Sequence, residues 1–372
     1  MKIPGAKPYC PDIPEVLAEV ETVLRSGRLI LGPFTERLEK AFAEYIGVKY
    51  AIAVATCSAA LEIVMQYAGV KGGEVIVPAN TFVACANTVL YAGATPIFAE
   101  TEKENFCLSL PDAIRKITPK TKAVMVVHLA GLPMPQIAKL RALCSERGLF
   151  LIEDCSHAHG ATIDGQKVGS IGDAGCFSLF ATKVITSGVG GIITTNNDDL
   201  MRFARSVRHQ GEGGSVENIV NLGNDWLMDE MRAVLAFHQF KNLEEIVAER
   251  NVIAGKYAAR ITRMPHVRSS AVPQNVRHSY YKFLAIVDEK VDKGKLVQDM
   301  KAAGVEMNTL YAKTIYQHPV YRDMGFVENQ CPATEEQMKH QIALPLYSRM
   351  SDEEIGYLMD TLEAELLKQT LA

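Results

Sequence analysis

Short apolar runs alternate with amphipathic stretches from about residue 48 to residue 196. The runs are rich in β-branched residues and end at small or turn-forming residues, which predicts strands. The predicted strands are Tyr50–Ala55, Glu74–Pro78, Thr95–Ala99, Lys122–His128, Phe150–Asp154, Gly175–Phe180 and Gly191–Thr195. The predicted helices between them are Ser58–Tyr67, Phe82–Tyr91, Pro111–Ile117 and Pro135–Glu146. Such alternation predicts an α/β fold with a mainly parallel sheet flanked by helices.

The pattern changes after about residue 228, where helical sequence dominates and a smaller α+β pattern follows. The elements predicted there are a long, possibly broken helical segment Met228–Met264, a strand Tyr281–Val287, a helix Lys293–Ala303 and a terminal helix Asp352–Gln369. Ser351 stands where the N-cap of the last helix is expected. We therefore predict a large domain over residues 1–245 and a small C-terminal domain over residues 246–372, within the range that the chain length allows.

Composition narrows the class of protein. The 372 residues are 48% hydrophobic and 22% charged, which excludes a largely disordered chain. The net charge is −4 and no basic tract occurs, so neither nucleic acid nor a membrane is expected as a partner. No apolar segment reaches the ~18 residues of a membrane helix. The eight cysteines form no CxxC pair, which favours buried thiols in a reducing cytoplasm over disulfides or zinc.

Two acidic residues end a strand that is apolar on both faces. Glu153 and Asp154 follow the run Leu149–Ile152, and ligands of parallel α/β sheets bind beyond the carboxyl ends of strands. Asp154 is therefore a candidate functional acid, with an N-cap for the next segment as the alternative. His157 and His159 follow as a His-x-His pair, but no third ligand is evident, so no metal site is expected.

Lys183 follows the predicted strand Gly175–Phe180, and glycines stand at 188, 190 and 191. A lysine that loses its solvation at a strand end has a lowered pKa, which makes the neutral amine available for Schiff-base chemistry. The glycines allow positive φ angles or close approach of the backbone. The alternative is a solvated surface lysine before a hairpin.

Small residues join the first predicted strand to its helix in the segment Ala55–Leu61. The free N–H groups and the dipole at such a helix start favour an anion, and the Ser58 hydroxyl adds a donor. A plain Ser N-cap accounts for the same residues.

In this order, these elements resemble the DegT/DnrJ/EryC1/StrS family of sugar aminotransferases, which have the fold-type I architecture and depend on pyridoxal phosphate (PLP). The resemblance covers nearly the whole chain. Its motifs are Gly27–Pro33, Thr56–Leu61, Pro78–Val83 with Ala92–Pro96, Ile152–Gly160, Phe177–Gly191, His318–Arg322 and Ala343–Tyr347. The block around the lysine is the most specific of them.

The resemblance implies roles for four residues around the cofactor ring. Lys183 matches the lysine that forms the internal aldimine with PLP and later moves the proton. Asp154 matches the acid that pairs with the pyridine nitrogen and keeps the ring an electron sink. His157 occupies the position near the PLP hydroxyl, and Phe82 matches the aromatic residue that stacks on the ring.

The resemblance also implies a phosphate site and a dimer. Ser58 and Ser178 match hydroxyls that hold the phosphate, assisted by the backbone amides of Cys57 and Ser58. A polar residue of a second subunit completes this site in the family, so a homodimer with active sites at the interface is expected. Asn224 and Asp225 are the candidates for that contact. Tyr311 and His318 are candidate substrate contacts.

Five positions depart from the family pattern. Cys57 replaces a glycine, Val189 replaces a glutamate in the glycine-rich loop, and Leu227 replaces an arginine. Asp225 stands where an asparagine is usual, and a carboxylate there would repel a phosphate dianion, so either Asn224 makes the contact or Asp225 points elsewhere. In the C-terminal domain Leu310 precedes Tyr311 where the family has His-Tyr, which indicates unusual acceptor specificity.

The predicted function is transfer of an amino group from L-glutamate or L-glutamine to a keto or aldehyde carbon of a sugar. The mechanism implied is ping-pong, through pyridoxamine phosphate, and the sugar is either nucleotide-linked or a free sugar acid. Lys183 argues against the dehydratase branch, which has histidine there. The alternatives are a keto-cyclitol or an aromatic amine precursor as substrate, and a catalytically silent regulatory relative. Lipopolysaccharide is among the usual destinations of such amino sugars.

Overall fold

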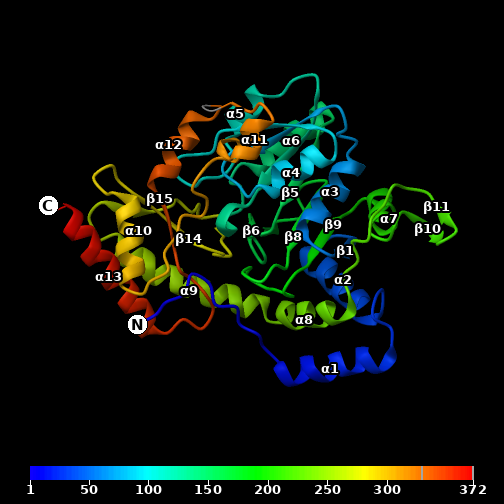
Figure 1. Ribbon diagram of the computed structural model, residues 1–372, viewed down its shortest axis with the longest axis horizontal. Helices are drawn as coiled ribbons and strands as arrows, with labels where there is room; N and C mark the ends of the chain where they lie inside the picture. Colours follow the sequence, from blue (N-terminus) through cyan, green and yellow to red (C-terminus); the bar gives the residue numbers. More distant parts are fainter. Residues whose placement is uncertain (328–329, 371–372) are drawn as a thin grey trace.

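A seven-stranded sheet forms the centre of the larger part of the computed structural model, which describes residues 1–327 and 330–370 (Figure 1). The strand order is β1-β9-β8-β5-β4-β2-β3. The strands are β1 (Tyr50–Val54), β2 (Glu74–Pro78), β3 (Thr95–Ala99), β4 (Thr121–Val127), β5 (Phe150–Asp154), β8 (Ala174–Ser178) and β9 (Gly191–Thr195). Only β9 runs antiparallel to its neighbours, and all other pairs are parallel, so the predicted α/β class is confirmed.

Helices cover both faces of this sheet. They are α2 (Pro33–Ile46), α3 (Cys57–Tyr67), α4 (Ala84–Tyr91), α5 (Leu110–Arg115), α6 (Ile137–Arg147), α7 (Asp198–Val207) and α8 (Glu230–Lys241). Alternate strand residues on one face pack with α3, α4 and α7, and those on the other face pack with α2, α8, α5 and α6. Burial on both faces explains why these strands are continuous apolar runs.

A second, smaller core lies toward the C-terminus. The strands β12 (Val267–Ser269), β14 (Phe283–Val287) and β15 (Gln341–Leu344) form an antiparallel sheet. It packs with α10 (Lys293–Ala302), α13 (Asp352–Thr370) and the second half of α9 (Leu243–Ile261), and Ile3 from the chain start joins this core. The first residues of α9 pack in the larger core instead, so this helix connects the two. The domain division at residue 245 stays a prediction.

The remaining elements are short apart from the first helix. They are α1 (Ile13–Ser26), β6 (Thr162–Ile163), β7 (Gln166–Lys167), β10 (Glu212–Ser215), β11 (Asn218–Ile219), β13 (Val276–Arg277), α11 (Pro319–Asp323), α12 (Pro332–His340) and the 3-10 turns Leu129–Gly131 and Ile315–Gln317. Figure 1 shows α1 beneath α8 and the β10–β11 hairpin extending away from the sheet.

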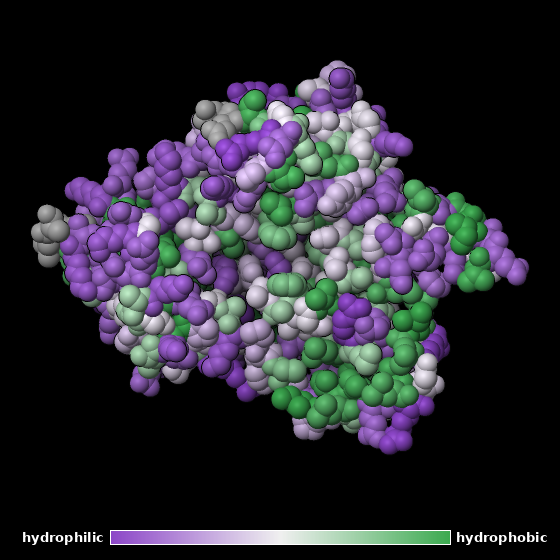
Figure 2. Space-filling model, viewed as in Figure 1, coloured by the Kyte–Doolittle hydropathy of each residue, from purple (hydrophilic) through white to green (hydrophobic). Residues whose placement is uncertain are grey.

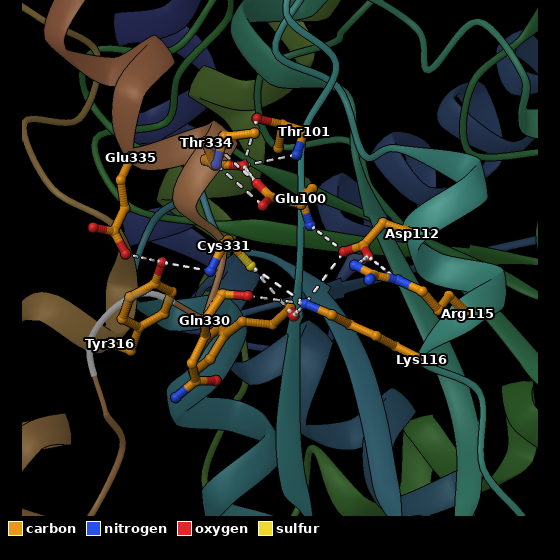
Figure 3. A network of polar contacts seen from close by, with 12 residues as sticks. Glu100, Thr101, Asp112, Arg115, Lys116, Tyr316, Gln330, Cys331, Thr334 and Glu335 are labelled. Carbon is orange, nitrogen blue, oxygen red and sulfur yellow. Dashed lines mark hydrogen bonds and ion pairs between the residues drawn. The ribbon is translucent and has the colours of Figure 1, made fainter.

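A polar network fixes α12 against the edge of the large sheet (Figure 3). The Glu100 carboxylate, just after β3, accepts the Thr334 N–H at 2.7 Å. Asp112 of α5 accepts the Glu100 N–H at 2.7 Å, and Lys116 lies 3.2 Å from the same carboxylate. Lys116 also donates to the Gln330 carbonyl at 3.3 Å. Each charged group therefore has several partners, which offsets its loss of solvation.

Three local predictions have clear outcomes. The segment Met228–Met264 is two helices, α8 and α9, which meet at Asn242. Ser351 does cap α13, since the Glu354 N–H donates to its hydroxyl at 3.1 Å. All eight cysteines are free, and Cys10 is the exposed exception to the expected burial.

Among the described residues, no helix combines the length and apolar composition that a membrane span requires.

Candidate active site

The predicted site residues come from several elements that end at one edge of the large sheet. Asp154 is the last residue of β5, and Ser178 is the last residue of β8. Cys57 is the first residue of α3, which follows β1. Because β1, β5 and β8 run in one direction, their carboxyl ends lie at the same edge, where α/β proteins bind ligands.

Lys183 lies in the loop after β8 and is half-buried. Its Nζ stands 4.7 Å from the centroid of the Tyr281 ring. Burial lowers the pKa of Lys183 to about 8, and the nearby Asp154 carboxylate partly opposes that shift. A solvated surface lysine would keep a pKa near its ordinary value of about 10.4. The environment therefore favours the neutral amine that Schiff-base chemistry needs.

The Asp154 carboxylate is 4% exposed and has a partner on each oxygen. Oδ1 accepts the Ser156 N–H at 2.9 Å. Asp154 therefore also stabilises the turn that follows β5, which agrees with the alternative prediction of a capping role. Oδ2 accepts the Cys85 thiol at 3.1 Å. Burial first, and the Asp154 charge second, raise the pKa of Cys85 well above its ordinary value, so the thiol keeps its proton and donates.

His157 is 2% exposed and is held in one tautomer. Its Nδ1 accepts the Ala130 N–H at 3.3 Å, which leaves the proton on Nε2, 3.5 Å from the Tyr311 hydroxyl. Its ring stacks on Tyr281 with centroids 4.4 Å apart. Burial and then the charge of Lys183 lower the pKa of His157 well below 6.5, so the ring is a neutral hydrogen-bond donor.

The start of α3 offers free backbone donors. Its N-cap is Thr56, whose hydroxyl accepts the Ala59 N–H at 3.0 Å, so the capping alternative for Ser58 is wrong. Ser58 is exposed in the first turn. Across the described residues no acceptor is assigned to the N–H groups of Cys57 and Ser58. Such a helix start is suited to a phosphate.

Gly191 explains the end of the glycine-rich segment. A Cβ at this position would lie 2.4 Å from the Thr56 carbonyl oxygen and 2.6 Å from the Cys57 nitrogen. Any side chain here would displace the start of α3. Gly191 also pairs with Ser178 across β8 and β9, which brings the Ser178 backbone beside the same helix start. Gly188 has a φ of +80°, so this glycine provides the positive φ angle that was predicted for the segment.

Two aromatic side chains from distant parts of the chain border this edge. Phe82, just before α4, is 56% exposed, and its ring lies 6.4 Å from that of Tyr311. The exposed face of Phe82 is available to stack on a planar ligand. His318 is the N-cap residue of α11, and no contact within the described residues joins its side chain to Lys183 or Asp154.

Asn224 and Asp225 lie on an exposed loop after the β10–β11 hairpin. The Asn224 side chain accepts the Asp225 N–H at 2.8 Å, which turns this amide back on its own loop. The next residue, Trp226, accepts the Ala55 N–H at 2.7 Å. The structure therefore places this loop beside the segment that leads into α3, with both polar side chains facing solvent.

Sequence reasoning missed three side chains around the site, namely Cys85, Tyr281 and Lys282. Tyr281 contacts both His157 and Lys183, and its hydroxyl lies 3.2 Å from that of Thr182. Tyr281 stands at the start of a predicted strand, which marked it only as a strand former. Nothing in the sequence joins it to a lysine 98 positions earlier.

The buried group His128, Glu153 and Cys155 has metal-ligand types but a different role. Glu153 accepts N–H groups from Gly169, Ile171 and Gly172 at 2.6 to 2.9 Å and lies 3.0 Å from His128 Nε2. With its lone pairs so used, Glu153 stabilises the turn before β8. His159, the second histidine of the His-x-His pair, is buried without an assigned partner on either ring nitrogen among the described residues.

Comparison with known proteins defines the class. The model of the DegT/DnrJ/EryC1/StrS aminotransferase family matches residues 12–363, and the chain belongs to this family. It is 32% identical over 366 residues to the spore coat polysaccharide biosynthesis protein SpsC of Bacillus subtilis, covering 94% of this chain and 93% of that protein. It is 33% identical over 330 residues to GDP-perosamine synthase of Vibrio cholerae, covering 87% and 88%.

Comparison with solved structures supports the same class of protein. The PLP form of the putative sugar aminotransferase Spr1654 of Streptococcus pneumoniae superposes with a TM-score of 0.92 at 26% identity, covering 99% of this chain and all of that one. The architecture is that of PLP aminotransferases, and the protein is a PLP-dependent transaminase. The site fits this cofactor, because it combines an amine of lowered pKa, a buried carboxylate and a helix start with free N–H groups.

The lowered pKa of Lys183 predicts how the cofactor-free protein takes up PLP. Only the neutral amine attacks the aldehyde, and with a pKa of about 8 roughly a tenth of the lysine is neutral at pH 7. The second-order rate of cofactor uptake should rise between pH 7 and 9 and level off above that. Stopped-flow absorbance at constant ionic strength measures it. A rate still rising tenfold per unit at pH 10 would contradict the assigned environment.

Proposed function

We propose that the protein moves an amino group from L-glutamate, or L-glutamine, to a keto or aldehyde carbon of a sugar. The observation that carries the proposal is the grouping of Lys183, Asp154 and His157 at the carboxyl edge of the sheet. The named relatives GDP-perosamine synthase and a UDP-N-acetyl-3-dehydro-α-D-glucosamine 3-aminotransferase support a sugar acceptor. The mechanism would be ping-pong, with bound PLP supplying the group that carries the amine between the two half-reactions. The amino sugar then serves surface polysaccharides such as lipopolysaccharide.

The roles of the ring-binding residues follow from their surroundings. When bound, PLP supplies an electron sink for the substrate carbon that loses a proton. Asp154, oriented by the Cys85 thiol, would supply the negative charge that keeps the pyridine nitrogen protonated. Lys183 would supply the amine that holds the cofactor and, once released, would move the proton. The Nε2 proton of His157 would be donated to the cofactor hydroxyl, and the exposed face of Phe82 would stack on the ring.

The phosphate is assigned to the start of α3. The backbone N–H groups of Cys57 and Ser58, which have no assigned acceptor among the described residues, would donate to it, and the hydroxyls of Ser58 and Ser178 would add donors. The helix dipole further favours the dianion. Tyr311 is assigned to the substrate side of the site, next to His157. His318 stays a substrate prediction: it is the N-cap residue of α11, and nearby the Ile315 N–H donates to the Ala79 carbonyl, just after β2, at 3.1 Å.

A homodimer is part of the proposal. The β10–β11 hairpin and the residues after it carry exposed apolar side chains, with Val216 at 75% and Leu222 at 92%. Figure 2 shows further apolar side chains over α1, where Leu17 and Leu24 are 62% and 58% exposed. Side chains of this kind are costly to leave in water. A second copy that covers them would receive the Asn224–Asp225 loop at its own phosphate site.

Replacing Asp225 with asparagine should strengthen PLP retention. A carboxylate of one subunit about 4 Å from the other subunit's phosphate opposes binding by about 1 kcal/mol at high dielectric, which corresponds to about a fivefold change in the dissociation constant. Fluorescence titration of the cofactor-free protein measures it. Asn224→Ala is the companion variant and should weaken binding if the amide makes the contact. Equal dissociation constants for D225N and the unsubstituted protein would show that Asp225 points away.

The function is tested by product analysis. PLP-loaded protein is incubated with L-glutamate and, one at a time, with 3-keto and 4-keto nucleotide sugars and a keto sugar acid. We expect 2-oxoglutarate and an amino sugar in equal amounts, with L-glutamine tested as the other donor. Amination of a keto-cyclitol but of no sugar would replace the proposed acceptor class.

A further inference from the structure

A small cavity lies directly beside Lys183, on the side of the smaller core. Its wall includes Lys183, Lys282 and Arg250, together with the chain segment at residues 6–9. No aspartate or glutamate contributes to the wall among the described residues. Two acids outside the wall act on wall residues: Asp154 on Lys183, and Glu249 on Arg250. Glu249 also accepts the Arg349 N–H at 3.3 Å. Four cationic residues, Lys7, Lys183, Arg250 and Lys282, therefore border one cavity without a carboxylate in its wall.

Hydrogen-bond donors on this wall are not all used. Arg250 is 6% exposed, and its Nη1 donates to the carbonyls of Tyr280 and Leu346 at 2.9 and 3.2 Å. Its Nε–H is buried with no assigned partner among the described residues. The Lys282 ammonium has three N–H groups, and its assigned partner is the Gly5 carbonyl. Buried donors without acceptors are uncommon in proteins and call for an explanation.

Burial first, and then the charges of Arg250 and Lys183, lower the pKa of Lys282 to about 8. An anion in the cavity would reverse these effects by supplying the missing negative charge.

We propose that Lys282 and Arg250 form a binding subsite for a substrate carboxylate next to the reactive amine of Lys183. A carboxylate has two oxygens and about four lone pairs, which match the free N–H groups of Lys282 and the Nε–H of Arg250. The cavity measures about 10 Å³, the space of one water molecule, so it must widen to admit a carboxylate. The proposal therefore requires residues 6–9 to move outward, which would also separate Lys282 from the Gly5 carbonyl.

The inference rests on the proposed function, and the ping-pong reaction supplies two sources for the carboxylate. One is the amino acid donor, and the other is a sugar acid as acceptor. Both would react at the cofactor held by Lys183, and Lys183 also lines this cavity. With the Lys183 nitrogen engaged by the cofactor, Lys7, Lys282 and Arg250 would be the free cationic groups of the wall.

The test measures binding of two unreactive carboxylates, glutarate and D-glucuronate, to PLP-loaded protein by calorimetry at fixed ionic strength. The Lys282→Met substitution removes the charge and keeps the length of the side chain. We expect it to weaken binding of glutarate, D-glucuronate or both by at least tenfold, and the probe affected identifies the source. Lys282→Arg should keep affinity within threefold. Lys293→Met is the matched control, because Lys293 is also half-buried and donates to a backbone carbonyl, that of Met338.

Two results would overturn the inference: binding of both probes by K282M as tightly as by the unsubstituted protein, or binding of neither probe by the unsubstituted protein. If K282M fails to hold PLP, Lys282→Gln takes its place with the same expectations. The proposed function is judged separately, by the visible band of the unsubstituted protein and its loss with L-glutamate. A normal band and normal bleaching with unaltered carboxylate binding in K282M would remove the subsite and leave the function standing.

Discussion

Replacing Lys183 with alanine is expected to abolish the visible band of lysine-bound PLP and to lower turnover by more than about 1,000-fold. The side chain both holds the cofactor and moves the proton, and general acid–base catalysis alone contributes about 100- to 10,000-fold. Its environment suits both tasks, because burial lowers its pKa to about 8 while Asp154 lies close by. Absorbance spectra and steady-state rates of the purified variant measure both effects.

The control for this variant is Lys282→Met, which changes the other lysine near the cavity. K282M should keep the visible band, since Lys282 is not assigned to hold the cofactor. A borohydride-reducible adduct of PLP retained by K183A, mapped by mass spectrometry to another lysine, would refute the assignment of Lys183.

Replacing Asp154 with asparagine should leave PLP bound and lower turnover by about 100-fold or more. A carboxylate beside a pyridinium contributes a few kcal/mol at an effective dielectric of about 20, and each 1.4 kcal/mol of barrier is tenfold in rate. Asparagine keeps the size of the side chain and an oxygen for the Ser156 N–H, so the turn after β5 should persist. Rates of both half-reactions, measured by stopped flow, separate this effect from a change in binding.

The matched control is Cys85→Ser, which keeps a donor to Asp154. C85S should retain most of the activity. Turnover of D154N equal to that of the unsubstituted protein would eliminate the proposed role of the carboxylate.

The strands of the sheet could be predicted with little error because each is buried on both faces. Glu74–Pro78, Thr95–Ala99, Phe150–Asp154 and Gly191–Thr195 have the predicted bounds. The short strands were not predicted, since two-residue pairs such as β6 with β13 depend on contacts between distant segments. The position of the break at Asn242 was not predicted either: α8 and the first residues of α9 pack in the same core, and the change of core comes later, within α9.

Site residues could be predicted where a reactive side chain ends a predicted strand or closely follows one. Lys183, Asp154 and His157 follow or end strands, and the structure brings them close enough for their charges to influence one another. Their roles remain predictions. The capping residue of α3 was not predictable, because Thr56 and Ser58 both carry hydroxyls and only the end of β1 decides between them. Tyr281 was not predicted as a site residue, because it contacts Lys183, which lies far from it in the sequence.

The visible absorption spectrum of the purified protein with PLP, before and after addition of L-glutamate, tests the central claim most directly. The account predicts a yellow band from PLP bound to Lys183 that bleaches as L-glutamate converts the cofactor to its pyridoxamine form. A protein that develops no such band, or a band that persists unchanged with both L-glutamate and L-glutamine, would contradict it.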